Sequence, residues 1–197
     1  VAPGNAGTAE IAENVNIKVT DFEALATFVE YNAIDMLVVG PEDPLVEGIR
    51  DYFEADARFA RLMIVGPGRA GAILEGSKDF AKEFMFRHHI PTAGYLTVTK
   101  DNLEKGFAFL ETLKPPYVLK ADGLAAGKGV VIPENREDAI TTLKEMMSDK
   151  KFGNAGDKIV VEEFLTGIET SILAFVDNDT IVPMVSSKDH KKVFEGE

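Results

Sequence analysis

The residues best suited to chemistry lie in one glycine-rich stretch, Lys120–Ile132. Its three glycines can adopt backbone angles closed to other residues and can expose their amide N–H groups. Successive exposed amides form a concave anion site, and a lysine beside them supplies the compact charge that a phosphate needs. The stretch therefore predicts a loop that closes over a polyphosphate. The residues concerned are Lys120, Gly123, Gly127, Lys128 and Gly129.

The loop joins two short apolar runs, Tyr117–Leu119 and Val130–Ile132, which predict the strands of a hairpin. A P-loop does not fit, because no serine or threonine follows Lys128 and because a strand, not a helix, follows the glycines. The G-x-G-x-x-G spacing of dinucleotide-binding proteins is absent from this stretch as well. The remaining alternative is a plain glycine-rich hairpin with solvated lysines.

The complete string from Lys120 to Ile132 resembles the glycine-rich loop of the ATP-grasp ligases. The order of its residues resembles that of the phosphoribosylamine–glycine ligases (glycinamide ribonucleotide synthetases) of purine biosynthesis. This resemblance extends over essentially the whole chain. It implies ATP as cofactor, with Mg²⁺ or Mn²⁺, and catalytic roles for Lys78 and Lys120. The ATP contacts it implies are Lys78, Lys120, Gly123, Gly127, Lys128, Gly129, Glu162, Phe164, Leu165 and Glu169.

The two lysines assigned to ATP have ordinary alternatives. Lys120 ends an apolar strand, where the resemblance implies a bridge between adenine N7 and the α-phosphate, but such a lysine is otherwise a snorkelling surface residue. Lys78 lies in Ala70–His89, which predicts one long helix or two abutting ones. Without the family resemblance, Lys78 would be predicted to be an ordinary solvated lysine. Helical spacing puts Lys78 and Lys82 on one face. The same spacing predicts a buried stripe of Ala81, Phe84, Met85 and His88.

The segment after the apolar run Ile159–Val161 is suited to binding a base. Backbone N–H and C=O groups at a strand end can bond adenine, while an apolar side chain covers the ring. The resemblance implies that Glu162 accepts the adenine amino group, that Phe164 and Leu165 offer backbone groups, and that Glu169 accepts the ribose hydroxyls. An acidic strand end without a ligand is the alternative.

The first third of the chain alternates strand and helix. A capping box at Thr20–Glu23 opens a helix, and the unbroken apolar runs Asp35–Val39 and Leu62–Val65 predict buried parallel strands on either side of a helix from about Leu45 to Ala55. This alternation predicts a parallel sheet with right-handed crossovers. Later in the chain, Tyr95–Thr99 predicts a strand, and helices are predicted to begin at Asp101 and at Asn135. The segments Ser171–Val176 and Thr180–Met184 predict a hairpin.

The predicted fold class is α/β. By resemblance, a doubly wound parallel sheet lacking its first strand (the pre-ATP-grasp domain) is followed by an ATP-grasp lid and the start of the ATP-grasp core. The expected boundaries are 1–74 for the N-terminal domain, 75–94 with 166–197 for the partial core, and 95–165 for the lid. A first strand is expected before Val1 and a long portion with the metal ligands after Glu197, so we expect the chain alone to be inactive.

Three loops resemble the family's substrate-binding segments: Pro3–Thr8, Gly40–Glu42 and Lys188–Lys192. The first two fit a simple surface turn equally well, with Glu42 as a solvated turn residue, and the third is a dense polar cluster. Lys192 replaces the family's usual arginine and Phe194 its usual glycine, which leaves the conformation of the third loop open. The residues assigned to substrate are Pro3, Gly4, Asn5, Gly7, Thr8, Gly40, Pro41, Glu42, Asp189 and Lys191.

Composition narrows the function classes. The 197 residues carry 21 basic and 33 acidic side chains, a net charge of −12, which disfavours nucleic-acid binding. The chain has no cysteine, and its three histidines are not placed to share a metal ion. No apolar run approaches the length of about 20 residues that a membrane helix needs, and no targeting pattern opens the sequence, so a cytoplasmic protein is expected.

The resemblance implies ligation of glycine to 5-phosphoribosylamine through glycyl phosphate, giving glycinamide ribonucleotide, ADP and phosphate. Three rival functions stay open: another ATP-grasp carboxylate–amine ligase, a non-catalytic ATP-binding module, and a structural domain that binds no nucleotide. No local pattern selects glycine, and the sequence does not determine the oligomeric state.

Overall fold

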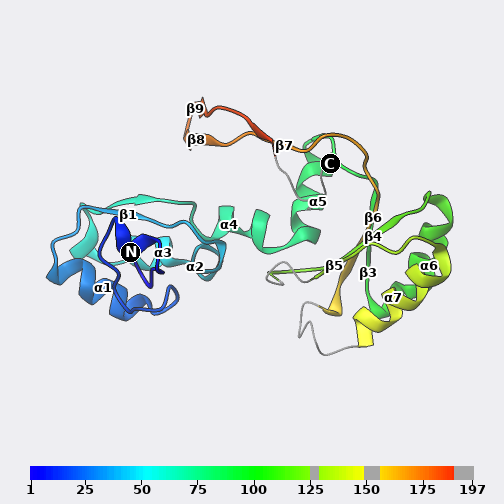
Figure 1. Ribbon diagram of the computed structural model, residues 1–197, viewed down its shortest axis with the longest axis horizontal. Helices are drawn as coiled ribbons and strands as arrows, with labels where there is room; N and C mark the ends of the chain where they lie inside the picture. The colour runs from blue at the N-terminus through cyan, green and yellow to red at the C-terminus, as the bar shows by residue number, and fades with distance from the viewer. Residues whose placement is uncertain (125–128, 149–155, 189–197) are drawn as a thin grey trace. The chain divides into compact units, whose positions relative to one another are not determined.

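The computed structural model describes residues 1–124, 129–148 and 156–188 (Figure 1). It is a mixed α/β protein that divides into two compact units, Val1–Glu163 and Phe164–Glu197. The first unit contains a two-stranded parallel sheet with its helices and a four-stranded antiparallel sheet. The second unit contains two short antiparallel strand pairs.

The parallel pair consists of β1 (Met36–Val38) and β2 (Met63–Val65). The middle residues, Leu37 and Ile64, pack on a core formed by α1 (Phe22–Tyr31), α3 (Ile49–Glu54) and a 3-10 turn at Ala57–Phe59. The prediction of fully buried strands is wrong, because helices cover only one face of the pair and alternate side chains on the other face are exposed. Those exposed residues are Met36, Val38, Met63 and Val65.

Two helix boundaries differ from the sequence prediction. The helix expected from Leu45 to Ala55 is two helices, α2 (Glu42–Glu47) and α3, separated by Gly48 at φ +90°. This left-handed conformation interrupts the helix, and glycine adopts it without a steric penalty. The helix α1 starts one residue later than the predicted capping box implies, since the carboxylate of Asp21 accepts the Ala24 N–H at 3.1 Å.

The four-stranded sheet has the order β3-β6-β4-β5. Its strands are β3 (Tyr95–Val98), β4 (Tyr117–Ala121), β5 (Val130–Val131) and β6 (Ile159–Glu163). Strand β4 pairs antiparallel with β5, with Lys120 opposite Val130, so the predicted hairpin around the glycine-rich loop is confirmed.

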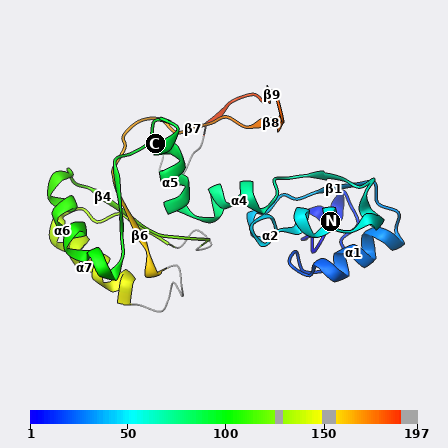
Figure 2. The same ribbon diagram turned by 180° about the vertical axis from the view of Figure 1, so that it is seen from behind.

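Side chains alternate between the two faces of this sheet. One face is apolar and packs on α6 (Leu103–Thr112) and α7 (Arg136–Ser148), which lie on the same side of the sheet in both views (Figures 1 and 2). This contact forms the larger core. Its strand residues include Leu96, Val98, Leu119, Ala121, Ile159 and Val161.

The opposite face of the sheet carries polar residues on three neighbouring strands and lies on the side of α5 (Lys78–Arg87). Helix α4 (Arg69–Gly76) precedes α5, so the predicted alternative of two abutting helices is confirmed. Ser77 separates them and caps α5, because its Oγ accepts the Phe80 N–H at 3.1 Å. The polar residues of this face include Tyr95, Thr97, Lys120 and Glu162.

The second unit contains β7 (Thr170–Ser171) paired with β10 (Ser187–Lys188), and β8 (Ala174–Asp177) paired with β9 (Thr180–Pro183). The pairing of β8 with β9 confirms the predicted hairpin, and Asn178 turns it at φ +42°. Within the described residues of the whole chain, no helix has the length and apolar content needed to span a membrane.

Candidate nucleotide site

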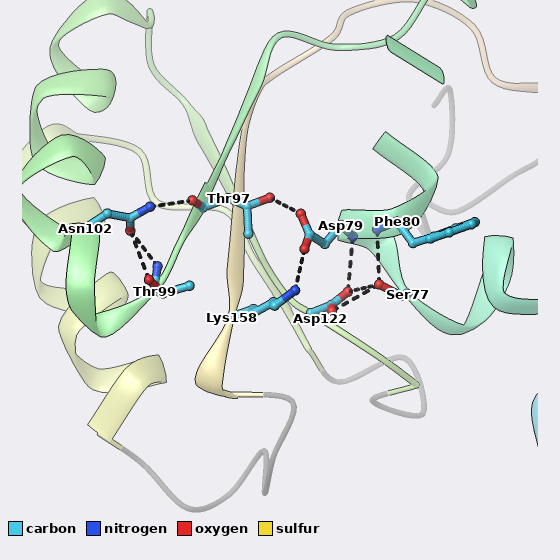
Figure 3. A network of polar contacts seen from close by, with 8 residues as sticks. All are labelled: Ser77, Asp79, Phe80, Thr97, Thr99, Asn102, Asp122 and Lys158. Carbon is cyan, nitrogen blue, oxygen red and sulfur yellow. Dashed lines mark hydrogen bonds and ion pairs between the residues drawn. The ribbon is translucent and has the colours of Figure 1, made fainter. Parts of the chain in front are cut away.

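The N-terminus of α5 binds the base of the glycine-rich loop. Lys78 Nζ donates to the carbonyl oxygen of Gly123 at 2.8 Å. The two flanking residues hold the preceding acid, since Ser77 Oγ donates to the carboxylate of Asp122 at 3.1 and 3.2 Å and the Asp79 N–H donates to it at 3.2 Å (Figure 3). The N-cap residue and the first two residues of α5 therefore fix two consecutive loop residues, and the Lys78 ammonium group contacts the start of the loop.

A second set of bonds connects this helix end to the sheet. Asp79 accepts from Thr97 Oγ1 on β3 at 2.7 Å and from Lys158 Nζ, just before β6, at 2.6 Å (Figure 3). Burial opposes ionisation of Asp79, but the hydrogen bonds from Lys158 and Thr97 and the charge of Lys158 outweigh it and lower its pKa. The same bond and charge raise the pKa of Lys158. The result is an ion pair that holds α5 against two strands.

This ion pair makes stability depend on pH. Because the folded pKa of Asp79 is depressed, its contribution is complete above the unfolded value and is lost as pH falls through the folded value. We expect Asp79→Asn to lower the free energy of unfolding by about 1 kcal/mol or less at neutral pH, since the Lys158 side chain is 48% exposed. The difference from the wild type should shrink below about pH 4, as measured by urea unfolding across the acid range.

The exposed Glu104→Gln on α6 is the control for this measurement. A difference between Asp79→Asn and the wild type that grows on acidification would contradict the ion pair. Lys158 causes no further change in stability near neutral pH. Because its folded pKa is raised above the usual value of 10.5, its contribution to stability is lost only at alkaline pH, above that value.

Lys120 lies on the polar face of the sheet, as its strand position requires. Its ammonium group bonds Glu162 Oε2 on the neighbouring strand at 3.0 Å, and Glu162 is only 5% exposed. A second lysine, Lys82, reaches the same oxygen at 3.4 Å. One carboxylate at the centre of the sheet is therefore shared by two ammonium groups.

The contacts of Lys82 were not predicted from the sequence. Its contacts agree with the prediction that it shares a helix face with Lys78, but that face is turned toward the sheet and Lys82 is only 6% exposed. The predicted burial of His88 is wrong, since His88 is exposed. The centroid of its ring lies 4.4 Å from the ring centroid of Phe84. Helical spacing cannot reveal a buried lysine whose partner, Glu162, is 80 residues away in the chain.

The charged side chains around this polar face balance one another. Four ammonium groups meet three carboxylates, and Glu83 is a fourth carboxylate that interacts electrostatically with Tyr95 and Lys158. A neutral cluster within a chain of net charge −12 is less repulsive to an anionic ligand than the rest of the protein. The other side chains counted are Lys78, Lys82, Lys120 and Lys158 with Asp79, Asp122 and Glu162.

The other predicted ATP residues fall into three groups. Gly129 accepts the Ala121 N–H at 2.8 Å and so belongs to the hairpin. Gly127 and Lys128 lie outside the described residues. Phe164, Leu165 and Glu169 belong to the second unit, where the first two are 39% and 65% exposed.

The first predicted substrate loop is closed by its own hydrogen bonds. Thr8 Oγ1 accepts the Asn5 N–H at 2.8 Å, and Asn5 Oδ1 accepts the Thr8 N–H at 3.0 Å. Asn14 completes the loop by donating to the carbonyl of Asn5 at 2.7 Å and accepting from Thr8 Oγ1 at 2.8 Å. Asn14 was not among the predicted site residues, because the local spacing contains no signal for it. Pro3 and Gly4 precede these residues, with Gly4 at φ +78°, and Gly7 lies between them.

The second predicted substrate loop follows β1. Pro41 precedes α2 in an extended conformation, and Glu42 is the first residue of that helix. Gly40 therefore lies just beyond the carboxyl end of a parallel strand, the edge at which α/β sheets bind ligands. Of the third loop, Lys188 is the last residue of β10, whereas Asp189, Lys191 and Lys192 lie outside the described residues, as does Phe194. Among the residues that are described, no group of three or more acidic, histidine or cysteine side chains could hold a metal ion.

Comparison with known proteins gives consistent matches along the chain. Residues 76–197 match the family described as phosphoribosylglycinamide synthetase, ATP-grasp (A) domain, and residues 1–75 match the phosphoribosylglycinamide synthetase N domain. The phosphoribosylamine–glycine ligase of Pasteurella multocida (strain Pm70) is 50% identical over 199 aligned residues, which cover 100% of this chain and 45% of that protein. The chain thus spans about half the length of the curated relatives it matches.

Solved structures agree with this match. The crystal structure of phosphoribosylamine–glycine ligase from Thermotoga maritima superposes with a TM-score of 0.70 at 28% identity, covering 93% of this chain and 42% of that one. N5-carboxyaminoimidazole synthetase from Staphylococcus aureus, a structure complexed with ADP, superposes with a TM-score of 0.66 at 18% identity, covering 96% and 47%. At that identity the second similarity shows the fold alone.

Proposed function

Because the chain belongs to the phosphoribosylglycinamide synthetase family, we propose that it carries the ATP-binding part of an enzyme that joins glycine to 5-phosphoribosylamine. The observation that carries the proposal is the arrangement at the start of the glycine-rich loop. Lys78 contacts the carbonyl of Gly123, and Lys120 precedes that residue by three positions on the polar face of the sheet. Two cations and the amide groups of a glycine-rich segment at one strand end suit a nucleotide polyphosphate.

The proposed reaction has two steps. A carboxylate oxygen of glycine attacks the γ-phosphorus of ATP, a P–O bond forms, and the bond to the β-phosphate oxygen breaks to release ADP. The amine of 5-phosphoribosylamine then attacks the carbonyl carbon of glycyl phosphate, phosphate leaves, and the nitrogen loses a proton as the amide of glycinamide ribonucleotide forms. The first step is needed because a free carboxylate has no leaving group, whereas an acyl phosphate has a good one.

In this proposal the residues of the chain act by positioning and by neutralising charge. Lys120 binds the α-phosphate and adenine N7, and Lys78 binds the phosphate tail together with the amides of the glycine-rich loop. Glu162 accepts the adenine amino group. The roles of Gly127 and Lys128 in the loop, and of Phe164, Leu165 and Glu169 at the adenosine, rest on the family resemblance alone.

The finer fold and domain assignment is part of the proposal. We assign 1–74 to a doubly wound pre-ATP-grasp domain, 95–165 to the lid, and 75–94 with 166–197 to the partial core. The matches of residues 1–75 and 76–197 to the two family domains support a boundary near residue 75. A cytoplasmic location stays a prediction.

Proteins of the ATP-grasp type use ATP with Mg²⁺, and we propose Mg²⁺ or Mn²⁺ here. The described residues do not offer a group of ligands for it, so no step above is routed through the metal. The substrates are assigned to the loops at Pro3–Thr8 and Gly40–Glu42 and to Asp189 and Lys191. This assignment rests on the family resemblance.

The test is a calorimetric titration of the chain with ATP and Mg²⁺, followed by an assay of glycine-dependent ADP release. We expect saturable binding of one ATP per chain and no turnover, since the chain spans about half of its relatives. Absence of binding would overturn the ATP site and favour a structural domain. Robust turnover by the chain alone would refute the predicted inactivity.

The longer protein separates the remaining alternatives. Glycine-dependent ADP release by a protein of the relatives' full length would support the proposed ligase. Release that depends on another amino acid or carboxylate would indicate a different ligase, and binding without any release would indicate a non-catalytic module. A different ligase and a non-catalytic module would each contradict the proposed reaction but not the proposed ATP site.

A further inference from the structure

Lys82 is a buried ammonium group that no step of the proposed reaction uses. It lies one helical turn after Lys78 on α5, and only 6% of it is exposed. Lysine is almost never buried to this extent unless its charge is paired. The group is therefore held in place by specific acceptors on the sheet side of the helix.

Three oxygen atoms surround Lys82 Nζ. Thr92 Oγ1 accepts at 2.8 Å, the Ala93 carbonyl accepts at 3.3 Å, and Glu162 Oε2 lies at 3.4 Å. Two of the three N–H donors of the ammonium group are therefore hydrogen-bonded, and its charge is paired with the Glu162 carboxylate. The Tyr95 ring lies 5.4 Å away and adds a weaker electrostatic contact. The ammonium is thus immobilised before any ligand arrives.

The arrangement sets the charge beside Lys120. If Glu162 had Lys120 as its only cationic neighbour, the two would form a neutral pair, and a phosphate would have to compete with the carboxylate for the ammonium. Lys82 shares Glu162 Oε2 with Lys120, so these three side chains carry a net charge of +1. The charge of Lys120 is then only partly neutralised by protein.

We infer that Lys82 is a positioning residue of the nucleotide site, which holds the Glu162 carboxylate and keeps Lys120 available to a polyphosphate. The inference rests on the proposed function, because it assigns Lys120 to the phosphates of ATP. It makes Lys82 a residue that acts through Glu162 and Lys120 without touching the ligand. A purely structural Lys82, which only attaches α5 to the sheet, is the competing explanation.

The experiment measures ATP affinity by calorimetry for the wild-type chain and for Lys82→Met. Methionine has a similar length without the charge, and Glu162 keeps Lys120 as a partner at 3.0 Å, so no carboxylate is left unpaired. We expect the dissociation constant for ATP to rise about tenfold, which lies within the range of coupling between members of one ion-pair network. The slope of its logarithm against salt concentration should decrease, because one charge of the site has been removed.

A double-mutant cycle separates positioning from a structural role. In a Lys120→Met/Glu162→Gln background, which leaves no unpaired buried carboxylate, Lys82→Met should change ATP affinity little, since both residues through which Lys82 acts are gone. Lys105→Met on α6, an exposed lysine beyond the apolar face of the same sheet, is the matched control and should bind ATP like the wild type.

Each outcome decides between the alternatives. Unchanged affinity in Lys82→Met, or an equal loss in both backgrounds, would overturn the inference while leaving the ATP site intact. No binding by the wild type would instead overturn the proposed function. If Lys82→Met does not fold, Glu162→Gln is compared with the double variant Lys82→Met/Glu162→Gln, which leaves neither buried charge. Equal ATP affinities support the inference, and a further loss in the double variant contradicts it.

Discussion

Lys120→Met should lower the affinity for ATP on the order of a hundredfold while leaving the protein folded. The expected loss follows from removing an ammonium group that bonds a charged phosphate, an interaction stronger than a neutral hydrogen bond. Folding should change little, because Glu162 keeps Lys82 as an ionic partner and Lys120 is at the edge of solvent with 29% of its side chain exposed. Calorimetric titration with ATP and thermal unfolding measure the two effects separately.

The control for this prediction is again Lys105→Met, which removes the same charge from an exposed position on α6. An affinity within about twofold of the wild type for Lys120→Met would contradict the assignment of this residue to the phosphates. A large loss of stability in the same variant would show instead that Lys120 serves the fold.

Leu119→Ala should have the opposite consequence, although it is the adjacent residue. Leu119 is fully buried on the apolar face of β4, in the core formed with α6 and α7. Truncating a buried leucine leaves a cavity and costs about 2 to 5 kcal/mol of folding free energy. We expect a loss in this range from urea unfolding, whereas the folded fraction should bind ATP with nearly the affinity of the wild type.

Ile132→Ala tests whether burial explains this effect. Ile132 follows the partner strand of the same hairpin and is 46% exposed, so its truncation should cost only about 0.5 kcal/mol. Equal losses for Leu119→Ala and Ile132→Ala would contradict the described packing. A large drop in ATP affinity for folded Leu119→Ala would contradict the separation of core and site by the two faces.

Adjacent residues have such different roles because a strand sends successive side chains to opposite faces. In β4, Leu119 and Ala121 belong to the core, whereas Lys120 lies on the polar face with Glu162. The next residue on that face, Asp122, is bound by the N-terminus of α5. The strand therefore contributes both to stability and to the candidate nucleotide site.

The sequence by itself determined the local features of this protein. Glycine spacing and the flanking apolar runs predicted the hairpin of β4 and β5, because turn chemistry and strand propensity act over a few residues. The amino-acid sequence of that hairpin also indicated the family. Helical periodicity predicted most helices but missed the break at Gly48, where a left-handed φ of +90° separates α2 from α3.

Only the tertiary structure decided how charges distant in the chain are paired. Lys82 meets Glu162 and Asp79 meets Lys158, pairs separated by 80 and 79 residues, because α5 lies across three strands that the chain forms later. The exposure of alternate residues in β1 and β2 likewise depends on which face the helices cover. Local sequence carries no signal for such contacts, since they arise when separate elements bury their apolar faces and bring their polar faces together.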